Sequence, residues 1–92
     1  MERIRAHVLI DGRVQGVNFR SYTRERACAG GVEGWVRNLD DGRVEAVFEG
    51  PRAAVQRVVS WCYGGPSPAC VERVEVQWER PTGQESGFSI VW

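Results

Sequence analysis

The first part of the chain carries two hydrophobic patterns, one typical of a strand and one of a helix. Apolar and polar residues alternate over residues 4–11, a period of two that predicts a β-strand with one buried face. A loop follows over residues 12–18, and Asn18 is a suitable N-cap for a helix that begins near Phe19. Gly30-Gly31 ends this helix. Its predicted apolar side carries Phe19, Thr23 and Ala27.

The middle of the chain predicts a β-hairpin and a second helix. Residues 32–39 and 43–49 are two strand-like runs joined by Asp40-Asp41-Gly42, a sequence typical of a tight turn. Gly50-Pro51 then introduces a helix with Pro at its first position. Apolar residues at helical spacing predict the buried face of this helix: Val55, Val58, Val59 and Cys62.

The last third predicts a strand over residues 74–79 and a short final strand over residues 88–92, separated by a polar loop. The order is β-α-β-β-α-β with a terminal strand, which is typical of an α+β ferredoxin-like sandwich. In this fold two helices cover one face of an antiparallel sheet, and the first strand lies beside the third in its interior. We therefore expect residues 1–92 to form a single domain.

Composition and charge narrow the partners of this domain. With 42% hydrophobic residues the chain has enough apolar surface for a packed core. Twelve basic and twelve acidic residues give a net charge of zero, so we expect neither nucleic acid nor an anionic membrane as a partner. No apolar run approaches the ~18 residues of a membrane span, and no signal peptide is evident. With no obvious spare apolar face, we expect a monomer.

The basic residues, the histidine and the cysteines exclude several chemistries. All basic residues are arginine, which excludes a P-loop lysine and any lysine nucleophile. His7 is the single histidine, which disfavours a Ser-His-Asp triad or a multi-histidine metal site. Three cysteines without paired spacing indicate a reducing compartment, so we expect a cytoplasmic protein. None of them has the spacing to an arginine that a cysteine phosphatase needs.

The segment from Gly12 to Arg20 combines the features of a phosphate-binding loop. Its glycines allow backbone N–H groups to turn toward one point, and the start of a helix adds unsatisfied donors with partial positive charge. Arg20 adds a planar fork of donors suited to phosphate. The alternative is an ordinary strand-to-helix connection whose glycines relieve backbone strain. The predicted binding groups are the Arg20 side chain and the backbone N–H groups of Gln15, Gly16, Val17, Asn18, Phe19 and Arg20.

Asn38 is the second candidate for this site. It lies near the end of the strand predicted over residues 32–39, and the ferredoxin-like topology brings that strand close to the loop after the first strand. A side-chain amide in this position can hold a water molecule for attack on phosphorus. The alternative is a strand-end asparagine that bonds the Asp40-Asp41-Gly42 turn.

The remaining polar and aromatic residues indicate structural roles. Acidic residues that alternate with apolar ones indicate a solvated sheet face rather than a metal site: Glu45, Glu49, Glu72, Glu75 and Glu79. Arg37, on the opposite face of its strand from Asn38, is expected to be solvated. Cys28, Cys62 and Cys70 are mostly core candidates. The tryptophans are expected to be packing residues: Trp35, Trp61, Trp78 and Trp92.

The loop and the Asn38 segment together resemble the acylphosphatase family. Residues 12–20, GRVQGVNFR, match its first signature, residues 34–42, GWVRNLDDG, match its second, and the likeness extends over nearly the whole chain. The resemblance implies a ferredoxin-like enzyme that hydrolyses the carboxyl-phosphate bond of small acyl phosphates to a carboxylate and inorganic phosphate, without metal or cofactor. It also implies that Arg20 binds phosphate and that Asn38 orients the attacking water.

Two residues depart from the family pattern, and two other functions remain open. Gly30 stands where a bulky apolar residue is usual, which is expected to cost about 1 kcal/mol or more of stability. Asn18 is an unusual residue for this loop. If its side chain capped the helix, it would occupy a backbone N–H group that otherwise faces the phosphate. One alternative function is a binding module that holds an anion without turnover. The other, an RNA-binding domain, is disfavoured by the missing aromatic-basic strand pattern.

Overall fold

The computed structural model describes residues 2–92 and shows the order of elements predicted from the sequence. The first strand is longer than predicted, because it continues to Arg13. The second helix begins at Arg52, directly after Pro51 rather than on it. The elements are β1 (Arg3–Arg13), α1 (Phe19–Ala29), β2 (Glu33–Asn38), β3 (Val44–Pro51), α2 (Arg52–Cys62), β4 (Cys70–Glu79) and β5 (Phe88–Ile90).

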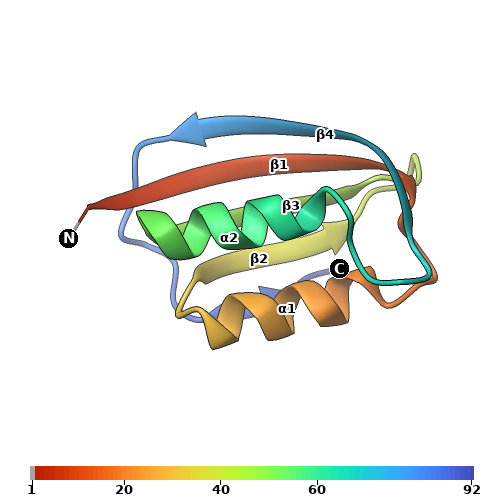
Figure 1. The fold of residues 1–92 in the computed structure, drawn as a ribbon. Coiled ribbons are helices and arrows are strands. Elements are labelled where there is room, and N and C mark those ends of the chain that lie inside the picture. The colour runs from red at the N-terminus through yellow and green to blue at the C-terminus, as the bar shows by residue number, and fades with distance from the viewer. Residues whose placement is uncertain (1) are drawn as a thin grey trace.

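The sheet has five strands in the order β4-β1-β3-β2-β5, and both helices cover one of its faces (Figure 1). β1 lies in the interior between β3 and β4, as the topology predicted. Neighbouring strands are antiparallel except for β2 and β5, which run parallel. The sheet is mixed at this edge because the chain leaves β4 and crosses to the opposite edge of the sheet before β5 begins. There the N–H of Gly34 donates to the carbonyl of Gly87 at 2.9 Å.

The core lies between the sheet and the two helices, and it follows the periods read from the sequence. Ala6, Val8 and Ile10 of β1 are fully buried, as a strand with one buried face requires. The predicted apolar faces of α1 and α2 are both buried. Thr23 is also fully buried in this core, and its hydroxyl donates to the carbonyl of Phe19 at 2.8 Å, so the polar group is satisfied.

The open face of the sheet is solvated at Glu72, Glu75 and Glu79, as the acidic residues indicated, but not at Glu49. Glu49 of β3 is 1% exposed, because the segment after β4 folds over it. Its carboxylate accepts hydrogen bonds from the backbone N–H groups of Thr82 at 3.1 Å and Gly83 at 2.8 Å, and from the guanidinium of Arg5 at 3.0 Å. Burial raises the pKa of Glu49, but these bonds outweigh it and leave the pKa below the ordinary 4.5.

Replacing Glu49 with glutamine is expected to destabilise the fold by about 3 kcal/mol at neutral pH, because Arg5 loses its buried partner. A carboxylate whose pKa is lower in the folded state than in the unfolded state stabilises the protein at pH values above its unfolded-state pKa. This stabilisation is lost as the pH falls through the folded-state pKa. The difference between the two proteins should therefore shrink below the ordinary value of 4.5. Urea unfolding at several pH values measures it.

Glu79 provides a matched control, because it bonds the same Arg5 at 3.1 Å but its side chain is 40% exposed. Replacing Glu79 with glutamine should cost less than about 1 kcal/mol, as is usual for exposed ion pairs. Equal costs at Glu49 and Glu79 would contradict a special role for the buried carboxylate.

Several residues expected in the core lie on the surface. Cys62 is buried, and burial raises the pKa of its thiol to about 12. Cys28 and Cys70 are exposed, so the expectation of core cysteines is wrong for both. Trp78 and Trp92 are 51% and 92% exposed, so they are not packing residues. The sequence pattern misplaced Trp78 because β4 is an edge strand, which buries less of each side chain.

Candidate active site

The loop between β1 and α1 is shorter than the sequence indicated. Gly12 lies inside β1 beside a bulge, and a Cβ at this position would approach the carbonyl oxygen of Cys70 to 2.2 Å. Gly12, with φ of +128°, is therefore explained by the pairing of β1 with β4. Gly16 has φ of +74° and open space beside it, so it is the glycine that turns the loop.

The loop delivers the chain to α1 without a side-chain cap. Asn18 occupies the N-cap position, as predicted, but its φ of 62° and ψ of 26° are left-handed and its side chain makes no capping bond. The first helical hydrogen bond runs from the N–H of Tyr22 to the carbonyl of Asn18 at 3.1 Å. The N–H groups of the first turn therefore precede the helical ladder, and no acidic residue lies in that turn. This helix end suits an anion.

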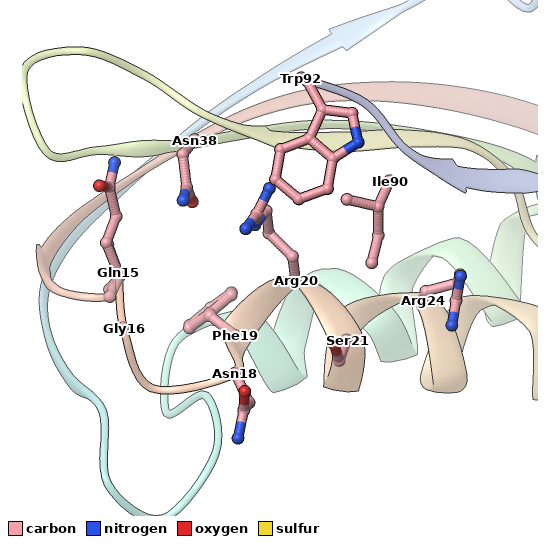
Figure 2. Close-up of a pocket in the computed structure, with 11 residues that line it drawn as sticks. Gln15, Gly16, Asn18, Phe19, Arg20, Ser21, Arg24, Asn38, Ile90 and Trp92 are labelled. Atoms are coloured by element: carbon pink, nitrogen blue, oxygen red, sulfur yellow. The ribbon is translucent and has the colours of Figure 1, made fainter.

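A surface cavity of about 410 Å³ lies between this loop, the start of α1, the end of β2 and β5 (Figure 2). Among the predicted binding residues, Val17 does not line it, because its side chain is buried in the core. At this cavity the end of β2 lies next to the loop, as the topology predicted. The predicted site residues that line it are Gln15, Gly16, Asn18, Phe19, Arg20 and Asn38.

The side chain of Gln15 ties the loop to the turn after β2. Its Nε2 donates to the carbonyl oxygens of Leu39 at 2.8 Å and Arg43 at 3.0 Å. These carbonyls flank the turn that follows Asn38. Only the backbone of Gln15 was predicted to belong to the site, but its side chain also joins the loop to the end of β2.

The Asn38 side chain points into the cavity, and the turn beside it is closed by other groups (Figure 2). The carboxylate of Asp41 accepts from the backbone N–H of Arg43 at 3.1 Å. The N–H of Leu39 donates to the carbonyl of Arg43 at 2.8 Å. Because the turn has its own bonds, it does not depend on Asn38, and the alternative of a turn-bonding asparagine loses its main support.

Arg20 lies in the first turn of α1 and presents its guanidinium to the cavity (Figure 2). The guanidinium carbon is 4.4 Å from the centroid of the Trp92 ring, within the range of a cation–π contact. Salt bridges among residues 2–92 occupy other arginines, namely Arg3, Arg5, Arg37, Arg43, Arg52 and Arg73. The donors of Arg20 are thus available to an anion in the cavity.

Five residues that line the cavity were not predicted as site residues from the sequence, and one of them, Val14, is also part of the core. Arg24 follows Arg20 by one helical turn, and this spacing is a signal that the sequence contained. Ser21 adjoins Arg20 on the same helix. Ile90 and Trp92 line the cavity only because β5 pairs with β2, and no local sequence pattern reveals that pairing.

The acylphosphatase family model matches residues 6–90, which include most of β1 and all of β5. The chain belongs to the acylphosphatase family. It is therefore a hydrolase of acyl phosphates, the activity that the resemblance implied.

Similar proteins cover the whole length of the chain. Acylphosphatases of Chloroflexus aurantiacus and of a Roseiflexus species are 70% and 68% identical over 92 residues, with 100% of this chain covered and 100% and 99% of theirs. The crystal structure of acylphosphatase from Bacillus subtilis is 38% identical and superposes with a TM-score of 0.92, over 97% of this chain and 99% of that chain. These matches confirm the ferredoxin-like fold.

His7 and its neighbours form a separate ionic cluster on the open face of the sheet. The Nε2 of His7 lies 2.6 Å from Oε2 of Glu45, whose other oxygen accepts from Arg37. Burial raises the pKa of Glu45, but the bonds from His7 and Arg37 outweigh it and leave the pKa below 4.5. His7 is half-buried, and Arg37, which was expected to be solvated, is exposed but paired. None of the three lines the cavity that acylphosphatase chemistry would use.

The described part of the chain holds neither a metal-binding cluster nor a membrane-spanning helix. Across residues 2–92, no three side chains of His, Cys, Asp or Glu come together in a way that would hold a metal ion. In the same residues, neither helix is long and apolar enough to cross a membrane.

Replacing Gly30 with alanine is expected to stabilise this family member by about 0.5–1 kcal/mol. Gly30 follows α1 with φ of −89° and ψ of −1°, which any residue adopts, and a Cβ would meet its nearest atom at 3.5 Å. A depression of about 280 Å³ lies beside it, lined in part by Ala54 and Trp61. The free energy of unfolding in urea measures the gain.

Gly31 provides the matched control, because it adjoins Gly30 but has φ of +70°. Replacing Gly31 with alanine should destabilise the protein by about 1 kcal/mol, because a side chain disfavours this conformation. A Gly30→Ala protein no more stable than the wild type would show that the missing side chain costs nothing.

Proposed function

We propose that the backbone N–H groups from Gln15 to Arg20, together with the Arg20 guanidinium, bind the phosphoryl group of the substrate, and that Asn38 orients the attacking water. The observation that carries this proposal is the single cavity that Arg20 and Asn38 line from opposite elements, α1 and β2. The uncapped start of α1 supplies further N–H donors to the same space.

The reaction proposed here is direct attack of water on phosphorus. The oxygen of water forms a bond to phosphorus while the bond from phosphorus to the carboxyl oxygen breaks, and the electron pair of that bond leaves with the carboxylate. A carboxylate is a good leaving group, so positioning and electrostatic stabilisation supply most of the rate acceleration. Arg20 and the loop amides stabilise the charge that develops on the phosphoryl oxygens.

The proton of the water needs an acceptor, and Asn38 cannot provide it. A neutral amide has no basic group at neutral pH, so its part is to hold the water by hydrogen bonds. We assign the acceptor to an oxygen of the substrate phosphate, which becomes inorganic phosphate. His7 is the nearest alternative by chemistry, but it lies in the ionic cluster with Glu45, outside the cavity.

The test is the hydrolysis of benzoyl phosphate by purified protein in the presence of EDTA, with near-ultraviolet circular dichroism to show that the protein is folded. Rapid turnover that EDTA leaves unchanged is expected, because the proposed machinery consists of side-chain and backbone donors alone. A folded protein that binds phosphate but does not consume benzoyl phosphate would instead be a binding module that holds an anion.

Three further properties belong to this proposal. We propose that residues 1–92 act as one domain, that the protein is a monomer, and that it works in the cytoplasm. Free thiols at Cys28, Cys62 and Cys70 support a reducing compartment. Light scattering after size exclusion tests the monomer, and cell fractionation tests the location.

A further inference from the structure

Trp92 has an unusual position for a large apolar side chain. It is 92% exposed, yet it lines the cavity and lies 4.4 Å from the guanidinium carbon of Arg20. An exposed indole makes few packing contacts to fix it, so the cation–π contact with Arg20 is the interaction that holds it at the cavity. Almost all of its apolar surface remains open to a ligand.

The in-line geometry of the reaction decides which part of a substrate lies near this indole. Attacking and leaving oxygens stand on opposite sides of phosphorus in a phosphoryl transfer. In Figure 2, the Asn38 amide and the Trp92 indole lie on opposite sides of the Arg20 guanidinium. A phosphoryl group at Arg20 with its water at Asn38 therefore directs its acyl group toward Trp92.

The surface on that side of the cavity combines the apolar side chains of Ile90 and Trp92 with the polar side chains of Ser21 and Arg24. Ile90 of β5 lies next to Trp92 and lines the same cavity (Figure 2). A flat ring placed against the indole would bury apolar surface of both partners and gain the stacking that aromatic pairs favour. A small acyl group such as acetyl is too short to cover either residue and would gain little.

From these observations we propose that Trp92 determines substrate specificity, by binding the acyl part of acyl phosphates that carry an aromatic or flat apolar acyl group. This inference rests on the proposed function, because the acyl group is placed by the assigned roles of Arg20 and Asn38. Trp92 contacts the part of the substrate that does not react, so it acts on KM rather than on the chemical step.

The experiment compares benzoyl phosphate with acetyl phosphate in the wild type and in Trp92→Ala, with inorganic phosphate as a competitive inhibitor of both. The KM for benzoyl phosphate should rise by about 2- to 10-fold in the variant, the range that an aromatic contact supports. The KM for acetyl phosphate and the inhibition constant of phosphate should change by less than about 2-fold, since neither ligand reaches the indole. Trp92→Phe should restore most of the lost affinity for benzoyl phosphate.

Trp78→Ala is the matched control, because Trp78 is also an exposed tryptophan, at 51%, but lies on β4 away from this cavity. It should change neither KM. Equal changes for both substrates and phosphate in Trp92→Ala would overturn the proposal and show that the indole acts only through Arg20. A fall in every KM would also overturn it, by showing that the indole covers the cavity. Turnover of acetyl phosphate by the wild type separates these outcomes from failure of the proposed function, in which neither substrate is consumed.

Discussion

Replacing Arg20 with alanine is expected to remove phosphate binding and to lower kcat/KM for benzoyl phosphate by about 10³-fold or more, the range known for arginines that stabilise a phosphoryl transition state. The guanidinium lines the same cavity as the residues of the loop, and it presents a planar fork of donors that fits phosphate oxygens. Isothermal titration with inorganic phosphate measures binding, and initial rates measure turnover. An Arg20→Ala protein that kept its phosphate affinity would disprove the assigned role.

Two further variants make the Arg20 result specific. Arg20→Lys keeps the charge but loses the fork, so it should recover only part of the binding. Arg26→Ala is a matched control, because Arg26 lies on the same helix and also stacks on a tryptophan, with its guanidinium carbon 5.3 Å from the Trp61 ring centroid. Arg26 does not line the cavity, so its loss should leave both phosphate affinity and turnover unchanged.

Replacing Asn38 with alanine is expected to lower kcat by roughly 10²-fold or more while the affinity for inorganic phosphate is largely kept, as is found when one oriented polar group is deleted. The amide is proposed to hold the water and not the phosphate, so the loss should fall on the chemical step. Steady-state kinetics with benzoyl phosphate, together with the inhibition constant of phosphate, separate the two effects.

The control for Asn38 concerns the turn that follows it. Asp41 closes this turn through its bond to the backbone N–H of Arg43, and it does not line the cavity. Asp41→Ala should loosen the turn with little effect on kcat. If Asn38→Ala lost phosphate affinity and turnover equally, or if Asp41→Ala reproduced its loss, Asn38 would be a structural residue.

The elements that local physics specifies could be predicted from the sequence. Alternation over residues 4–11 indicated β1, and Asp40-Asp41-Gly42 indicated the turn between β2 and β3, because strand period and turn chemistry depend on neighbouring residues. The positions of Arg20 at the start of α1 and Asn38 at the end of β2 could be predicted for the same reason. Their roles in the reaction remain predictions, which the variants above test.

The sequence was misleading where a residue's surroundings come from distant parts of the chain. The spacing of the glycines placed Gly12 in the loop, but glycine is needed at this position because the backbone of Cys70 in β4 approaches it closely. Glu49 followed the pattern of a solvated strand face, yet Thr82 and Gly83 cover it. In both cases the sequence did not reveal which distant segment packs against the residue.

The sequence by itself determined the order of the elements, the side of each that is buried, and which polar residues stand at their ends, because periods of 2 and 3.6 residues and glycine conformations are local properties. Only the tertiary structure decided that Arg20 and Asn38 share one cavity of about 410 Å³, and that Trp92 stands beside them. Gln15 shows the physical reason. Its amide bonds carbonyls 24 and 28 residues away, and such contacts exist only once the sheet has assembled.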